Sequence, residues 1–332
     1  MFNSNFYRMV LRQIFCRISL FTLLALLLFA ETVWTQTITR ADEILRDRIT
    51  AYRQKIDTAA SWHATDDQLG MLWLQVASDY ADELDFQRSE EASAHSLKLL
   101  RTSPEQTHYA AALDNLGSVY LVTDRFKESE SCRRKALAIY EVLGDEVGAS
   151  RVRIGLSIAL VHEHRFAESE EESTKALKSL QEQKEPDKYV LIAGLISSSY
   201  AKCFQNRCDE GLIAASQAVT LVRTMSTKDP RVEVAALMVL GFEQWKTGSE
   251  QDGEKTMREA LEQLRQGKNL PQAMLVDAQL KVLAGYTNYL KATHQKAIAK
   301  QMESEITRLK GEQTAPCRDC VVNVMALSAK SR

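Results

Sequence analysis

Apolar residues recur every three or four positions through most of this chain, with polar residues between them. Ala136, Ile139, Tyr140 and Leu143 show the spacing. Residues spaced in this way fall on one stripe of an α-helix and leave the opposite stripe polar. The pattern extends from about residue 38 to residue 311 and predicts an all-α chain of amphipathic helices.

The helical pattern repeats along the chain. The segment 116–137 returns as 156–177, and a related segment lies at 76–97. Each copy has an anchor residue in a first helix and a small or apolar anchor in a second helix. The anchors are at 76 and 96, 116 and 136, 156 and 176, 196 and 218, 240 and 260, and 286 and 306, so their separation is constant except in the fourth copy, where it is longer by two. This internal distance predicts repeated antiparallel helix pairs with turns near 125, 165 and 207.

Proline and glycine mark the boundaries between the copies. Proline is excluded from helix interiors, and every proline of the chain falls between copies or after the last one. These residues are Pro104, Pro186, Pro230, Pro271 and Pro316. Gly144 and Gly148 take their place between the second and third copies. The sequence therefore predicts six helix pairs, over 70–103, 110–143, 150–183, 190–225, 234–267 and 278–311.

The two ends of the chain differ from the repeats. Arg8, Arg12 and Arg17 precede an apolar stretch from residue 18 to 30, which Glu31 stops before it reaches membrane-spanning length. We interpret residues 1–35 as a signal peptide cleaved near Ala30 or somewhat later. The alternative is an uncleaved N-terminal membrane anchor. Residues 38–66 are predicted to contain a helix that caps the array, and residues 312–332 an irregular tail.

The repeat resembles the tetratricopeptide pattern. A small or apolar pair, a Tyr three residues on, a turn, an aromatic residue and then Ala-Leu occur in that order, and the copy from Leu113 to Leu137 matches best. The spacing between copies exceeds the roughly 34 residues of the standard repeat and is similar to the kinesin-light-chain subclass. The resemblance covers about residues 70–311, although the fifth copy has Gln244 in place of the Tyr. It implies a right-handed α-α superhelix, that is, a TPR-like solenoid.

A stack of helix pairs curves, so its first helices are expected to line a concave groove. The resemblance implies that an Asn of the first helix holds a peptide backbone amide there, with basic residues meeting a carboxylate. Asn115 matches that Asn, whereas Gly155, Leu195 and Val239 replace it in other copies, which argues against a complete two-carboxylate clamp. Neighbouring copies or the tail from Gly311 could instead bury several groove positions. The expected peptide-binding residues are Gln75, Asn115, Ser118, Arg151, His162, Lys202, Phe242, Trp245, Lys246 and Asn288.

Charge and motifs exclude several classes of function. The chain has 42 Lys and Arg against 44 Asp and Glu, without a basic block, so nucleic acid is not an expected partner. It contains no phosphate loop, nucleophile elbow or dinucleotide fingerprint, so we expect neither an enzyme nor a cofactor. His162-Glu163-His164 is not expected to bind a metal, because residues two apart on a helix point in different directions. The acidic run 168–172 is interpreted as a solvated helix start.

The oxidation state expected of the cysteines depends on the compartment. After Cys16, five cysteines remain, and an exported chain would meet oxidising conditions. Cys203 and Cys208 bracket a predicted turn and are candidates for a disulfide. Cys317 and Cys320 follow the last repeat and predict a loop disulfide or no bond, with a redox or zinc site as the alternative. Cys132 is expected to be a small packed residue.

Together these features predict an exported, non-enzymatic scaffold that binds a protein or peptide segment in its concave groove. Two other interpretations stay open. The first is a redox or metal-handling protein that uses the Cys317/Cys320 pair. The second is a membrane-tethered assembly platform, which would require residues 1–35 to stay attached.

Overall fold

A computed structural model describes residues 43–226, 229–266 and 272–312 of the protein. A helix over residues 43–57 and the short 3-10 helix η1 (Ala59–Trp62) come first. The first helices of the following pairs are α2 (Asp66–Asp82), α4 (Gln106–Val122), α6 (Glu146–His162), α8 (Lys188–Cys203), α10 (Pro230–Lys246) and α12 (Gln272–Ala292). The second helices are α3 (Phe86–Leu100), α5 (Phe126–Leu143), α7 (Phe166–Glu182), α9 (Cys208–Arg223), α11 (Glu250–Gln266) and α13 (Lys296–Glu312).

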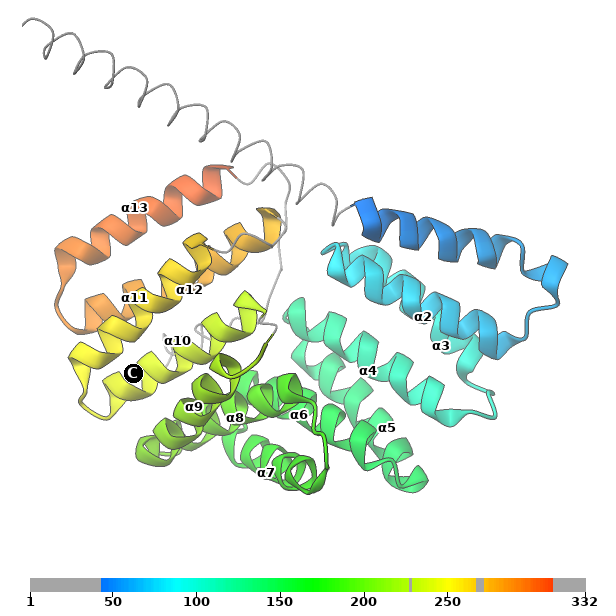
Figure 1. The fold of residues 1–332 in the computed structure, drawn as a ribbon, viewed down its shortest axis with the longest axis horizontal. Helices are drawn as coiled ribbons and strands as arrows, with labels where there is room; N and C mark the ends of the chain where they lie inside the picture. Colours follow the sequence, from blue (N-terminus) through cyan, green and yellow to red (C-terminus); the bar gives the residue numbers. More distant parts are fainter. Residues whose placement is uncertain (1–42, 227–228, 267–271, 313–332) are drawn as a thin grey trace, which may run out of the picture.

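The helix pairs stack one after another. Figure 1 shows them around an arch, with α2 and α13 near its two ends and α6 to α9 in the middle. Successive first helices touch one another, and no comparable contact joins successive second helices of the described residues. The first helices therefore occupy the shorter, concave side of the arch. The described residues contain no strand, and the prediction of an all-α solenoid of six helix pairs is confirmed.

Each hairpin turns at one residue with a positive φ angle, and the second helix begins two residues later. These residues are Leu84, Asp124, His164, Asn206, Gly248 and His294. The predicted turns near 125, 165 and 207 are thus confirmed. The second-helix anchor follows each turn residue at the same distance in every pair, from 84 to 96 through 294 to 306. The segment from the turn to the second anchor therefore has the same length in all six pairs.

The register of the fourth pair differs from the one that the sequence predicted. Counting back eight residues from the turn at Asn206, as in the other pairs, places its first anchor at Ser198 instead of residue 196. The anchor separation, from 198 to 218, then equals that of the other pairs. The two additional residues lie before α8, in the junction after α7. Ile196 and Tyr200 resemble the anchor and Tyr of other copies, which explains the error.

Small residues at the helix crossings support this register. Ser89 Oγ donates to the carbonyl of Ala77 at 2.7 Å, and Ser129 and Ser169 repeat the bond at the equivalent positions of the next two pairs. In the fourth pair the equivalent residue is Gly211. A Cβ atom there would lie 2.9 Å from the carbonyl oxygen of Ser199. The two helices of a pair therefore approach closely at the same repeat position in pairs one to four.

The hydrophobic core is continuous in the second half of the array and divided in the first. One cluster extends from Val161 at the end of α6 to Leu309 on α13. Smaller clusters hold α2 to α6 together. The helix over residues 43–57 packs on α2 through Ile49, and Arg48 Nε donates to the buried carboxylate of Asp79 at 2.8 Å. This helix occupies much of the predicted cap region 38–66.

No helix among the described residues is both long and apolar enough to span a membrane. The predicted signal or anchor at residues 1–35 lies outside the described residues. Residues 313–332 of the predicted tail also lie outside them, together with Cys317 and Cys320.

Candidate functional site

A cavity of about 370 Å³ opens on the concave side of the middle pairs. Its wall comes from the first helices α4, α6, α8 and α10, and most of the lining side chains are apolar. The lining residues are Val122, Ile158, Val161, His162, Tyr189, Ile192, Ala193, Ile196, Ser197, Tyr200, Asp229, Arg231, Val232 and Ala235. The cavity thus crosses four consecutive repeats and suits an elongated ligand.

The corrected register of α8 accounts for most of that helix's part in the cavity. With Ser198 as anchor, the inward positions of the fourth pair include Ala193, Ile196, Ser197 and Tyr200, and all four line the cavity. They were missed because the predicted register began two residues too early. Counting back from Ala218 by the distance that separates the anchors of the other copies would have identified them.

Lys202 was predicted in the groove from the earlier register, and the structure places it elsewhere. It stands four residues after the anchor, the position that Tyr120 has in the second pair. Its Nζ lies 3.7 Å from a carboxylate oxygen of Glu210 on α9, and it does not line the cavity. The shift of two residues turns this side chain from the concave side toward the partner helix.

His162 is a predicted groove residue that lines the cavity. Its ring stacks on Phe126 with a centroid distance of 4.5 Å and is buried. Gln75 lines a second cavity, of about 540 Å³, between the 43–57 helix and α2. Val122, Val161 and Ala235 also stand at inward repeat positions and line the cavity, although they were not among the predicted groove residues.

Asn115, Ser118 and Arg151 lie beside a buried charge network of the second and third pairs. Asn115 Oδ1 accepts a hydrogen bond from Ser93 at 3.3 Å, and Ser118 Oγ accepts one from Arg133 at 2.9 Å. Arg151 Nε donates to the Asp114 carboxylate at 3.3 Å, although its side chain is half exposed. These side chains have internal partners, but Ser118 and Arg151 are exposed and Asn115 is only partly buried, so neighbouring repeats do not bury them as the alternative interpretation expected.

The predicted residues of α10 and α12 divide between core and surface. Phe242 is buried in the large core cluster, so it is not an exposed apolar anchor. Trp245 packs edge-on against Tyr289 and carries the exposed Lys246 above its ring, with Nζ 4.8 Å from the centroid. Asn288 is partly exposed on α12.

Charges gather at the rim of the cavity where α10 begins. Asp229 caps α10 by accepting from the backbone N–H of Arg231 at 2.8 Å, and its Oδ2 lies 2.6 Å from Arg231 Nη2. Hydrogen bonding to Asp229 raises the pKa of Arg231 above its ordinary value. Burial raises the pKa of Asp82 at the end of α2, an effect that Arg231 opposes. Arg231 therefore acts electrostatically across the groove on the first pair.

The acidic run on α7 is used in ion pairs, mostly within its own helix pair. Glu172 binds Arg153 at 2.6 Å, Glu171 binds Lys175 at 2.7 Å, and the other two carboxylates pair with arginines at the hairpin turns. Glu168 and Glu171 are exposed, as expected of a solvated helix start, whereas Glu170 and Glu172 are partly buried.

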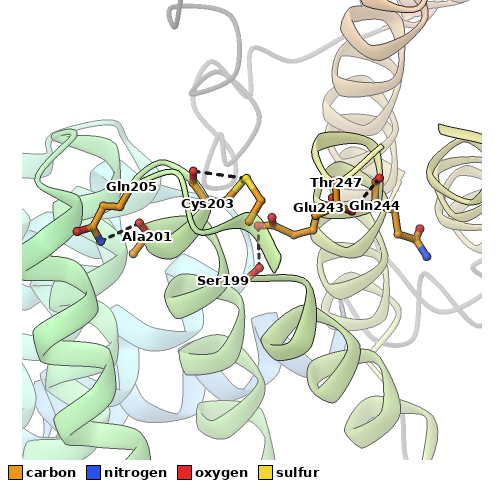
Figure 2. Close-up of a disulfide and its surroundings, with 8 residues drawn as sticks. Ser199, Ala201, Cys203, Gln205, Glu243, Gln244 and Thr247 are labelled. Atoms are coloured by element: carbon orange, nitrogen blue, oxygen red, sulfur yellow. Dashed lines mark hydrogen bonds between the residues drawn. A yellow bond between two sulfur atoms is a disulfide. The ribbon is translucent and has the colours of Figure 1, made fainter. Parts of the chain in front are cut away.

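The cysteines give one confirmed prediction. Cys203 and Cys208 form a disulfide that joins the end of α8 to the start of α9 (Figure 2). Cys132 on α5 is partly buried, and burial raises the pKa of its thiol. Within the described residues, Cys203, Cys208 and Glu243 bring potential metal-ligating atoms within 4.8 Å of one another. In the disulfide state the two sulfurs bind each other.

Comparison with known proteins identifies the repeat. Residues 109–182 match the family model described as tetratricopeptide repeat. The match covers α4 to α7, so these two helix pairs are tetratricopeptide-like repeats. No curated protein is similar enough to this chain to count as a match.

Solved structures share the fold of this chain at low sequence identity. The apo form of RapI has 13% identity and a TM-score of 0.66, and the match covers 80% of this chain and 91% of RapI. BtubC from P. vanneervenii has 16% identity and a TM-score of 0.56, with 68% and 92% covered. NprR in complex with its cognate peptide NprX has 9% identity and a TM-score of 0.55, with 85% and 83% covered.

Proposed function

We propose that this protein is an exported, non-catalytic scaffold whose concave groove binds a peptide or an extended segment of a partner protein. The observation that carries the proposal is the cavity that crosses α4, α6, α8 and α10. Its volume, about 370 Å³, falls in the range of clefts that take up ligand groups. A site built by four repeats suits a ligand that extends along the array.

The lining indicates the chemistry of the ligand. Ile158, Ile192 and Ile196 surround the cavity, so a large apolar side chain would gain free energy by leaving water there. Tyr200 and Ser197 add hydroxyl groups, and Arg231 provides a charged rim. We infer a peptide with an aromatic or aliphatic anchor, and Asn115, Trp245 and Lys246 as further contacts along the groove.

Two structural neighbours support a peptide ligand. NprR was solved with its cognate peptide NprX, and a Rap protein was solved in complex with Competence and Sporulation Factor. Their likeness to this chain lies in the fold, at 9% and 11% identity. The apolar cavity is the independent reason to expect the same kind of ligand here.

Export is the second part of the proposal. The three arginines and the apolar stretch of residues 18–30 support it, and the Cys203–Cys208 disulfide suits an oxidising compartment. N-terminal sequencing of the mature protein tests it. A mature chain that begins after Ala30 supports export, and one that retains Arg8 supports the membrane-anchored alternative.

A matched pair of substitutions tests the groove. Ile196 lines the cavity, whereas Ile213 is 61% exposed on α9 and lies outside it. Peptides selected from a random display library against the full chain would be measured by fluorescence anisotropy. We expect Ile196→Glu to weaken binding at least about tenfold, because it places a charge in an apolar site, and Ile213→Glu to leave binding unchanged.

Two results would contradict the groove assignment. One is a library that yields no peptide binding the folded chain. The other is equal binding by the two variants. If Ile196→Glu weakens binding as expected, Asn115→Ala, Trp245→Ala and Lys246→Ala show which of the other predicted residues contribute to affinity.

A further inference from the structure

The two sulfurs of the Cys203–Cys208 disulfide have different surroundings. Cys203 is the last residue of α8 and is buried, at 6% exposure. Cys208 is the first residue of α9 and is partly exposed. A helix N-terminus stabilises a thiolate and a helix C-terminus disfavours one. The pair therefore combines an accessible sulfur suited to carry negative charge with a buried one that is not.

A buried carboxylic group faces this pair. Glu243 on α10 is fully buried, and its side chain points toward the disulfide in Figure 2. Its Oε1 accepts a hydrogen bond from Ser199 at 2.8 Å, and its Oε2 has no hydrogen-bond partner. Atoms of Glu243 and both sulfurs lie within 4.8 Å of one another. An unpartnered carboxyl group in such a place costs free energy, and a disulfide that only cross-links two helices does not require it.

The protonation of Glu243 suits proton transfer near neutral pH. Burial raises its pKa to about 8, while the hydrogen bond from Ser199 and the charge of Lys246 on the same helix oppose the rise. Tyr200 on α8 is the other ionisable group that interacts with it, and burial together with Glu243 raises the pKa of that phenol. Glu243 can therefore hold a proton beside the disulfide and release it at modest cost.

We propose that Cys203 and Cys208 form a thiol–disulfide exchange site in which Cys208 reacts with external thiols or disulfides and Glu243 transfers the proton of Cys203. This activity is separate from the binding of a peptide in the groove. The co-reactant is a low-molecular-weight thiol or a cysteine of a partner protein. Glu243 acts as a positioning and proton-transfer group for Cys203.

The exchange balances in two steps. An external thiolate attacks Cys208 Sγ, the bond to Cys203 breaks, and the leaving Cys203 sulfur takes the proton of Glu243. A second external thiolate then attacks the external sulfur of the mixed disulfide, and Cys208 leaves as a thiolate beside the N-terminus of α9. The chain gains two electrons and two external thiols become one disulfide. Glu243 regains a proton from solvent, and the reverse steps oxidise the chain.

The test follows the reverse direction with Ellman's reagent. The full chain would be reduced and freed of reagent, in a background that replaces the other four cysteines, Cys16, Cys132, Cys317 and Cys320, with serine. The first thionitrobenzoate released reports the attack by Cys208. The second reports the attack of Cys203 on the mixed disulfide, which requires the Cys203 proton to leave.

The expected result separates the two steps. Glu243→Gln should leave the first release within about twofold and slow the second at least about tenfold near pH 7, because general base catalysis of the second step is lost. Above about pH 8, where Glu243 is ionised, the second release should level off in the unchanged chain and keep rising with pH in this variant. Glu233→Gln is the matched control, since Glu233 is another largely buried glutamate of α10. Cys203→Ser should release a single equivalent.

Three outcomes would overturn the proposal. The first is equal rates of both releases in Glu243→Gln and Glu233→Gln chains whose circular dichroism shows the folded state. The second is a Cys208→Ser chain that reacts as fast as Cys203→Ser. The third is one Zn²⁺ bound per reduced chain that blocks both releases and depends on Glu243, which would make the three residues a metal site.

Discussion

Arg133 is a charged residue that is buried inside the described array. Its guanidinium group is buried between α4, α5 and α6 and donates to the carbonyl of Gly117 at 2.9 Å. Asp114 lies 3.4 Å from its Nε and provides the opposite charge. Burial lowers the pKa of Arg133, and Asp114 acts in the other direction. A buried charge is tolerated here because hydrogen bonds and a carboxylate replace water.

Gly155 makes room for this charge because it has no side chain. A Cβ atom at Gly155 would overlap the Arg133 guanidinium group, so Gly155→Ala must displace it from its partners. We expect a loss of about 2–3 kcal/mol in the free energy of unfolding, measured by urea titration.

Gly311→Ala is the control for this prediction. Gly311 also lies on a helix, and a Cβ atom there would meet no other atom of the described residues within 4 Å. Alanine is the better helix former, so we expect a change within about 1 kcal/mol, in the stabilising direction. Equal effects of the two substitutions would show that the Arg133 network has no role in stability.

Residue roles could be predicted from the sequence only in part. The Cys203–Cys208 pairing followed from two cysteines around a predicted turn, and His162 followed from its repeat position. The burial of Phe242 could not be predicted from the sequence, because it depends on how the neighbouring repeats pack around one face of α10. Glu243 was missed for the same reason, since no local pattern places it beside the turn of the preceding pair.

At the scale of elements, ion pairs connect successive hairpin turns. Arg125 Nη1 lies 2.9 Å from Glu90 on the preceding pair, and Arg165 Nη1 lies 2.8 Å from Glu130. Arg207 and Glu170 repeat the pair. Between the fourth and fifth pairs the ion pair is absent, because Leu212 and Ser249 occupy the positions of the Glu and the Arg. Between the fifth and sixth pairs, a hydrogen bond from Gln295 to Glu254 takes the place of the ion pair. The same carboxylate position thus joins most adjacent pairs.

We expect this series to contribute modestly to stability. The side chains of Arg165 and Glu130 are 35% and 15% exposed, so solvent screens their attraction. A double-mutant cycle of Arg165→Ala and Glu130→Ala should give a coupling below about 1 kcal/mol at low salt, measured by urea unfolding. The coupling should shrink further in concentrated salt because of screening. A larger coupling that salt does not change would contradict this picture.

The elements themselves were largely predictable, and the exception has a clear physical cause. Amphipathic spacing and proline positions located the six pairs, because both report directly on helix interiors and helix ends. The register of α8 was wrong because residues 196 to 200 imitate the anchor and the Tyr of other copies. Periodicity alone cannot distinguish two stripes two residues apart when both are apolar. The close approach of Gly211 to Ser199 distinguishes them, and it is visible only in three dimensions.

At the scale of the whole molecule, the array consists of local contacts. Each pair packs on its neighbours, and the core cluster of α8 to α13 is larger than those of the first pairs. Arrays of this kind open in parts because a repeat loses support only from adjacent repeats. The cap helix and the first pair are therefore expected to exchange amide hydrogens faster than α8 to α10.

Leu237→Ala tests this local cooperativity. Leu237 is fully buried on α10, and its truncation should cost about 2–5 kcal/mol. Hydrogen exchange followed by mass spectrometry should show faster exchange from α8 to α11 and unchanged exchange from α2 to α5. Leu143→Ala is the control, since Leu143 is 48% exposed at the end of α5. A uniform loss of protection along the chain would mean that the array unfolds as one unit.

The constant distance between the two anchors of each hairpin has a consequence for how such a chain can change. Every hairpin keeps one fixed distance from its turn to the second anchor, while the turns themselves, at 84, 124, 164, 206, 248 and 294, are unevenly spaced. The fold therefore tolerates inserted or deleted residues in the linkers between hairpins, and not inside a hairpin. A linker that grows by two residues leaves each hairpin intact and shifts only where the next one docks. An epitope tag or a fused domain is accordingly best placed at a linker such as residues 183–187, between α7 and α8.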